Sequence, residues 1–262
     1  MLSLGISPCP NDTFIFCAMA AGYRLVLDDV EALNRRAEAG ELDVTKISVA
    51  AYGRIRERYA LLRAGGAAGF GVGPLLVAAS PRKPGGRIAI PGVRTTAALL
   101  LRLLGEFDTV PMRFDEIEDA VLGGSVDCGV LIHEGRFTYE RKGLVKLRDL
   151  GEVWEERLHG PLPLGAIAIR RSLGEEAARG IDAEIRASLQ RARERPRECA
   201  DFVRRHAQEM SPEVVQSHID LYVNDYSLAL DAAAVTKLVR LGEEQGLYAP
   251  SAEPIFAYDD EA

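Results

Sequence analysis

Residues 1–140 contain the same succession of predicted elements twice, and this duplication constrains the fold more than any other feature of the sequence. In the first copy, an apolar segment at 2–7 predicts a strand that leads through a loop into a helix over 14–21. A second amphipathic helix then turns at Gly40 into an apolar strand over 44–49. Strands that each follow a helix are typical of parallel β-sheet.

The second copy begins with an apolar strand over 87–90, and the loop after it ends at Thr95 and Thr96. A helix is predicted next from apolar residues at helical spacing, namely Ala97, Leu100, Leu101 and Leu104. A later helix turns at Gly123 into an apolar strand over 128–132. The two copies together predict two α/β lobes.

Two further apolar strands, over 73–79 and 164–169, precede and follow the second copy and carry the chain from one lobe to the other. We therefore predict an α/β protein with the two-lobed type 2 periplasmic-binding-protein fold and a ligand cleft between its lobes. Lobe 1 is expected to comprise residues 1–83 and 168–262, and lobe 2 residues 84–167.

The composition is that of a globular protein, with 47% apolar and 27% charged residues in a chain of 262. Acidic and basic residues are interleaved at a net charge of -7, so no basic stripe is available for nucleic acid. No apolar run approaches the ~20 residues that cross a bilayer, and no secretion signal is visible. We expect a cytoplasmic protein that binds neither nucleic acid nor membrane.

The cysteines lie at Cys9, Cys17, Cys128 and Cys199, without CxxC spacing or a neighbouring His cluster. This arrangement suggests neither a zinc site nor a disulfide framework. All of the thiols are expected to be reduced.

Ligands of open parallel sheets bind beyond the carboxyl ends of the strands, so the loops after the predicted strands are the candidate site. At Thr95 and Thr96, a helix start either attracts a carboxylate to its backbone amides or is simply capped by Thr95, and the sequence leaves both open. Asn11, Asp12 and Thr13 present the same choice. Capping is favoured there, because an Asp is a poor neighbour for an anion.

Lys46 interrupts the apolar strand over 44–49, and Ser48 lies on the same side of that strand. Both side chains together are suited to bind a carboxylate. A lysine in such a strand is also typical of a solvated sheet edge, and the residues alone favour the edge.

His133 follows the apolar strand over 128–132, where a side chain emerges at the carboxyl end, and imidazole is suited to proton transfer near neutral pH. The residues alone favour a histidine that forms a local hydrogen bond at the strand end. Glu134 is placed either to orient the ring or to pair with Arg136.

Six segments resemble the 1,4-dihydroxy-6-naphthoate synthases of the futalosine route to menaquinone, in the order of that family and over nearly the whole chain. They are SPCPNDTF at 7–14, TKIS at 45–48, PGVRTTA at 91–97, HEGRFTY at 133–139, LPLG at 162–165 and YVNDYS at 222–227.

The resemblance implies a lyase that needs no cofactor or metal and cleaves the sugar-derived part from cyclic dehypoxanthinylfutalosine, a small-molecule carboxylate, as the naphthoate ring becomes aromatic. It implies that His133 is the proton acceptor. Its substrate-binding positions carry over to Lys46, Ile47, Ser48, Thr95 and Thr96.

Two other functions remain open. Chorismate dehydratase, an enzyme of the same pathway and fold, also binds a cyclic carboxylate, but the segment at 133–139 disfavours it. A solute-binding receptor for a small organic anion is the second, because a fold alone does not fix function. The lack of a visible export signal disfavours the receptor. The sequence gives no indication of the oligomeric state.

Overall fold

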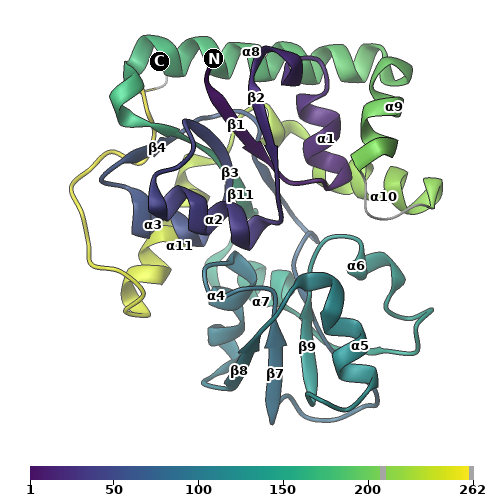
Figure 1. Cartoon of the computed structure of the whole chain (residues 1–262). Coiled ribbons are helices and arrows are strands. Elements are labelled where there is room, and N and C mark those ends of the chain that lie inside the picture. Colours follow the sequence, from purple (N-terminus) through teal and green to yellow (C-terminus); the bar gives the residue numbers. More distant parts are fainter. Residues whose placement is uncertain (207–210, 260–262) are drawn as a thin grey trace. The chain divides into compact units, whose positions relative to one another are not determined.

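A computed structural model describes residues 1–206 and 211–259, and the chain divides into two compact units (Figure 1). Unit 1 comprises residues 1–68 and 163–262, and unit 2 comprises residues 69–162.

The strands are β1 (Ser3–Ile6), β2 (Arg24–Leu27), β3 (Val44–Ser48), β4 (Tyr59–Leu61), β5 (Ala67–Gly69), β6 (Leu75–Ala78), β7 (Arg87–Ile90), β8 (Asp108–Pro111), β9 (Cys128–Leu131), β10 (Val145–Asp149) and β11 (Leu162–Arg170). The helices are α1 (Pro10–Phe16), α2 (Val30–Ala39), α3 (Tyr52–Ile55), α4 (Thr96–Leu101), α5 (Ile117–Leu122), α6 (Gly135–Thr138), α7 (Leu150–Leu158), α8 (Gly174–Glu194), α9 (Pro196–His206), α10 (Pro212–Tyr222) and α11 (Ala232–Glu244).

The predicted duplication is confirmed by the strand order of the sheets. In unit 1, β1 lies between β2 and β3 and is parallel to both. In unit 2, β7 lies between β8 and β9 and is likewise parallel to both. In each sheet an antiparallel strand borders the copy, since β11 pairs with β3 and β6 pairs with β9. The carboxyl ends of the parallel strands are therefore equivalent positions in both units.

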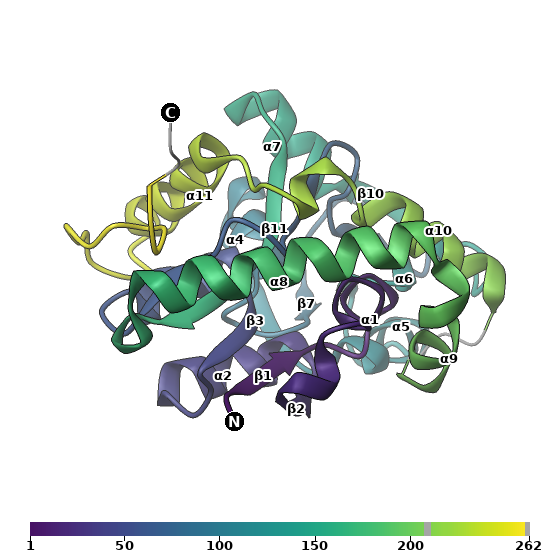
Figure 2. The ribbon, with the colours of Figure 1, turned by 90° about the horizontal axis from the view of Figure 1, so that it is seen from above.

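The sheet of unit 1 is covered on both faces (Figure 1). One face packs apolar residues of β1, β3 and β11 against α1, α8 and α9, and Figure 2 shows α8 running across this sheet. α2 lies against β3 on the other face and ends at Gly40, whose φ of 73° places it in the left-handed region that glycine adopts without cost. The predicted turn at this glycine is confirmed.

The sheet of unit 2 has a smaller core, in which α5 packs through Ile117 and Val121 against apolar residues of β6, β7 and β9. α4 and α7 contact each other and the strands β9 and β6, respectively. Trp154 of α7 is fully buried, and its indole N–H donates to the carbonyl oxygens of Gly160 and Pro161. These contacts hold α4 and α7 on the sheet and fix the segment that follows α7.

The boundaries of the units differ from the predicted crossings at residues 83/84 and 167/168. β6 was expected to belong with the first lobe, but it pairs with β9 and β10 in the sheet of unit 2. An apolar strand pattern does not specify which of two sheets the strand joins, because both sheets present unpaired backbone groups at an edge.

The expectation that all thiols are reduced was wrong. Cys17 and Cys199 form a disulfide across a sequence separation of 182 residues, and Cys9 and Cys128 are free and buried. The two bonded cysteines meet because α1 packs against α9. Their spacing along the chain gives no sign of this contact.

The disulfide predicts the number of titratable thiols. In protein unfolded without reductant, we expect Cys9 and Cys128 to react with a thiol reagent, which gives two thiols per chain. After reduction all of the cysteines of the sequence should react, which gives four. Four thiols before reduction, in protein prepared without reductant, would show that Cys17 and Cys199 are not joined.

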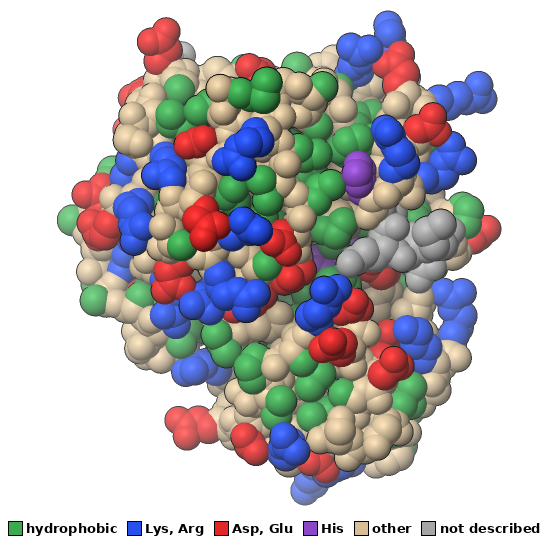
Figure 3. Space-filling model, in the orientation of Figure 1, with side chains coloured by type: hydrophobic (Ala, Val, Ile, Leu, Met, Phe, Trp, Pro, Cys, Tyr) green, Lys and Arg blue, Asp and Glu red, His purple; other side chains and the backbone are tan. Residues whose placement is uncertain are grey.

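Within the described residues, no helix combines the length and the apolar composition that crossing a membrane requires. Figure 3 shows that basic and acidic side chains are interspersed on the face that it draws.

Candidate functional site

Lys46 lies in the middle of the sheet of unit 1, because β3 is bordered by β1 on one side and by β11 on the other. The interpretation of Lys46 as a solvated edge lysine was therefore wrong. Its side chain is only 6% exposed. A buried ammonium is costly unless it is paired, so this position requires an acidic partner.

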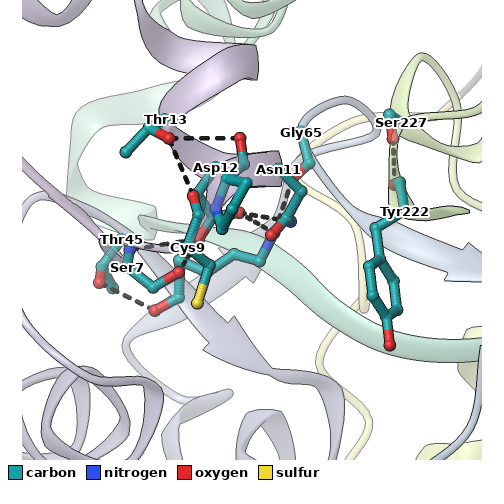
Figure 4. Close-up of polar contacts among 11 residues, drawn as sticks. Ser7, Cys9, Asn11, Asp12, Thr13, Thr45, Gly65, Tyr222 and Ser227 are labelled. Atoms are coloured by element: carbon teal, nitrogen blue, oxygen red, sulfur yellow. Dashed lines mark hydrogen bonds and ion pairs between the residues drawn. The ribbon is translucent and has the colours of Figure 1, made fainter. Parts of the chain in front are cut away.

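Asp12 is that partner. The Nζ atom of Lys46 lies 2.7 Å from the Oδ1 atom of Asp12 and donates a second hydrogen bond of 3.1 Å to the carbonyl oxygen of Gly65. The backbone N–H of Gly65 in turn donates to the carbonyl of Ser227 at 2.9 Å. Figure 4 shows Asp12 with Ser7 on one side and with Asn11 and Gly65 on the other.

Asp12 is held by further hydrogen bonds. Its Oδ2 atom accepts from the backbone N–H and the hydroxyl of Ser7, at 3.2 and 2.7 Å, and its Oδ1 atom accepts from the Asn11 amide at 3.0 Å. The prediction that residues 11–13 cap a helix was wrong, because α1 starts at Pro10 and its N-cap residue is Cys9. A proline at the first helical position moves the helix start ahead of these polar residues.

Ser48, at the end of β3, is bound by Asn34 of α2 and not by the partners of Lys46. The Asn34 side chain accepts from the Ser48 backbone N–H at 2.9 Å and donates to its hydroxyl oxygen at 3.1 Å. Ile47 between them is fully buried. The strand end is thus fixed from α1 through Lys46 and from α2 through Ser48.

Thr95 in unit 2 caps α4, which is one of the two alternatives that the sequence left open. Its hydroxyl oxygen accepts from the backbone N–H of Ala98 at 3.1 Å, and its hydroxyl proton goes to the carbonyl of Gly92 at 2.8 Å. Thr96 is the first residue of α4 and is also buried. The hydroxyl of Thr95 is therefore engaged within the chain, as donor and as acceptor.

His133 lies after the carboxyl end of β9, as predicted. Its φ of 54° is in the left-handed region, which few residues other than glycine adopt, although histidine is enriched there. The imidazole meets the ring of Phe114 edge to face, with 5.0 Å between the ring centroids. Its Nε2 atom is buried. Uncommon backbone conformations of this kind cluster at functional sites.

Arg136 of α6 anchors the segment after His133. Its Nη2 atom donates to the Oδ2 atom of Asp149 at 2.8 Å, and its Nη1 atom donates to the carbonyl of Gly73. Asp149 also caps α7, because its Oδ1 atom accepts from the backbone N–H of Gly151 at 2.8 Å. The sequence offered Glu134 as a partner for Arg136 and gave no indication of Asp149.

Tyr139 ends the same segment, and its hydroxyl donates to Glu140 at 2.9 Å. Burial raises the pKa of Tyr139, and the hydrogen bond to Glu140 and the negative charge of that carboxylate raise it further. Tyr139 therefore keeps its proton at neutral pH.

The roles of Asp12, Asn34 and Asp149 were not predicted from the sequence. Asn34 falls on the apolar face of its helix, four residues after Val30, and a polar side chain on such a face requires a hydrogen-bond partner. That signal was present in the sequence. Asp12 and Asp149 gave no comparable signal, since each looks like an ordinary loop or cap residue until its partner is known.

The chain is similar to proteins of menaquinone biosynthesis over nearly its whole length. Residues 2–244 match the family described as menaquinone biosynthesis. A 1,4-dihydroxy-6-naphthoate synthase of Thermus thermophilus is 49% identical over 268 residues, which covers 97% of this chain and 98% of that relative.

Two solved structures of other proteins have the same fold as this chain. A crystal structure of a protein from Archaeoglobus fulgidus is 39% identical and has a TM-score of 0.89, covering 94% of this chain and 98% of that one. The ligand-binding component of an ABC-type import system from Staphylococcus aureus is 14% identical and has a TM-score of 0.72, covering 98% of this chain and 96% of that one. The predicted α/β fold of the periplasmic-binding-protein type is confirmed.

Proposed function

We propose that this chain, which belongs to the menaquinone biosynthesis family, is an enzyme that converts cyclic dehypoxanthinylfutalosine to 1,4-dihydroxy-6-naphthoate. The observation that carries the proposal is the 49% identity, over nearly the full length of both chains, to a synthase of that name. The position of His133 at a strand end beside Phe114 supports it.

In the proposed reaction, His133 removes a proton from a hydroxyl or an acidic carbon of the bound substrate. The electron pair left behind starts a retro-aldol-like cleavage of a carbon–carbon bond, and formation of the aromatic naphthoate drives the reaction forward. This chemistry requires a base whose pKa is near the working pH, which is the usual role of histidine.

Substrate binding is assigned to Lys46, Ile47 and Ser48 of unit 1 and to Thr95 and Thr96 of unit 2. The hydrogen bonds of Thr95 indicate that it and Thr96 have different roles. The Thr95 hydroxyl is engaged within the chain while it caps α4. Thr95 is therefore assigned the role of holding the start of α4, and Thr96 keeps the contact with the substrate that the resemblance implies.

This division predicts different effects for two substitutions. Thr96→Val should raise KM about 3- to 10-fold with little change in kcat, as expected for the loss of one hydrogen bond that binds ground state and transition state alike. Thr95→Ala should lower the free energy of unfolding by about 1 kcal/mol through loss of the cap, whereas Thr95→Ser should not. Steady-state kinetics and urea unfolding check both. Loss of kcat alone in Thr96→Val would contradict the assignment.

Turnover of candidate substrates separates the proposed function from its alternatives. We expect purified protein to convert cyclic dehypoxanthinylfutalosine and to leave chorismate unchanged. Turnover of chorismate would identify a dehydratase. Tight binding of a small carboxylate without turnover of either compound would identify a solute-binding receptor, like the ligand-binding component of an ABC-type import system that shares this fold.

The proposal includes no cofactor and no metal, a cytoplasmic location, and no nucleic acid or membrane as partner. Activity that survives dialysis against EDTA and passage through a desalting column would support the first two points. Fractionation of cells tests the location. The Cys17–Cys199 disulfide makes this test important, because disulfides are rare in most cytoplasmic proteins.

A further inference from the structure

One N–H group of the Lys46 ammonium has no acceptor among the described residues. It carries three N–H groups, of which one donates to Asp12 and one to the carbonyl of Gly65. No other described residue accepts from Lys46. The side chain is nonetheless 94% removed from solvent, since only 6% of it is exposed.

The carboxylate of Asp12 fixes the direction of this remaining N–H. Asp12 cannot follow Lys46 if the lysine moves, because Ser7 and Asn11 hold both of its oxygen atoms. The negative charge of Asp12 also compensates the ammonium at 2.7 Å. Lys46 therefore offers one directed hydrogen bond and no uncompensated charge.

Gly165 of β11 provides the space that the lysine occupies. It lies opposite Ser48 in the antiparallel pair of β11 and β3. A methyl group added at Gly165 would lie 2.9 Å from the Cε atom of Lys46, 3.2 Å from the carbonyl oxygen of Ile47 and 3.8 Å from the Lys46 Nζ atom. The flexible lysine would have to shift to relieve the closest of these contacts.

We infer that Asp12 and Gly165 are positioning residues, which hold Lys46 so that its third N–H donates to a single oxygen atom of the substrate. Asp12 acts through charge and direction, and Gly165 acts through the absence of a side chain. The inference rests on the proposed function, and it adds two positioning residues behind one of the substrate-binding positions that the resemblance implies.

Gly165→Ala tests the role of space. The φ of Gly165 lies outside the left-handed region, so alanine is compatible with the backbone, and the methyl group displaces Lys46 rather than unfolding the sheet. We expect kcat/KM to fall about 10-fold or more while the unfolding midpoint stays near that of the wild type, the loss expected for one hydrogen bond from a charged donor. Gly180→Ala is the matched control, because a methyl group there meets no atom within 4 Å.

Asp12→Asn tests the role of charge, with Lys46→Met as its reference. We expect Asp12→Asn to lower kcat/KM about 10- to 100-fold, again the range for a hydrogen bond from a charged group. In the background of Lys46→Met, the same change should have almost no further effect on kcat/KM, since Asp12 acts only through the lysine. The double variant also buries no unpaired charge, so it remains folded if Asp12→Asn alone does not.

The outcomes separate this inference from the proposed function. An inactive wild-type protein would overturn the proposed function. An active wild type, together with unchanged kcat/KM in Gly165→Ala or additive losses for Asp12 and Lys46, would overturn the positioning roles and leave the proposed function intact.

Discussion

His133→Asn is expected to lower kcat for the cleavage of cyclic dehypoxanthinylfutalosine by about 10²- to 10⁴-fold, the usual contribution of a general base. Asparagine tolerates the left-handed backbone that His133 adopts, with a φ of 54°, so the segment after β9 should keep its conformation. Its amide cannot accept the proton. KM should change little, because the substitution removes an interaction that is formed in the transition state.

His159→Asn is the matched control for this variant. His159 lies in the same unit, is the C-cap residue of α7 and has a φ of 48°, so both substitutions place an asparagine at a positive φ. We expect His159→Asn to retain kcat within about 2-fold, as for a residue without a role in proton transfer. Equal losses in both variants would indicate a backbone effect and would contradict His133 as the base.

Asp149→Ala is expected to lower the free energy of unfolding by about 3–5 kcal/mol, the cost of leaving a buried charge without its partner. The Asp149 side chain is 2% exposed and that of Arg136 is 18% exposed, so water replaces little of the lost interaction. The substitution also removes the cap of α7. Urea unfolding followed by the fluorescence of Trp154, the one tryptophan of the chain, reports directly on unit 2.

Two further variants separate the causes of this loss. Asp149→Asn retains a good N-cap residue, so the destabilisation that remains measures the ion pair with Arg136. Asp115→Ala removes an exposed ion pair of the same unit, with side-chain exposures of 59% for Arg113 and 45% for Asp115, and should cost less than about 1 kcal/mol. A loss for Asp149→Ala as small as that for Asp115→Ala would show that Arg136 does not depend on Asp149.

The framework of the fold was predictable because it depends on short-range patterns. Apolar segments in the sequence became β1, β3, β7 and β9, and helical spacing identified α4. The cap at Thr95 was one of two local alternatives, and local hydrogen bonds decided it. Membership of each strand in a sheet was harder to predict, as β6 shows, since it depends on pairing with strands that are distant in sequence.

The environment of the candidate site depends on contacts that no local pattern encodes. Lys46 is buried because β11 pairs with β3, and β11 begins more than a hundred residues later in the chain. Asp12 was interpreted as a cap, since its pairing with Lys46 becomes visible only when α1 is placed on the sheet. The disulfide between Cys17 and Cys199 depends in the same way on the packing of α1 against α9.

The most direct test of the proposed function is the mass balance of a single reaction. Purified wild-type protein is incubated with cyclic dehypoxanthinylfutalosine, and all products are identified by chromatography and mass spectrometry. We predict that 1,4-dihydroxy-6-naphthoate and the released sugar-derived fragment appear in equal amounts as the substrate disappears. Substrate that remains intact in the presence of folded protein, or that is consumed without release of the naphthoate, would contradict a carbon–carbon lyase.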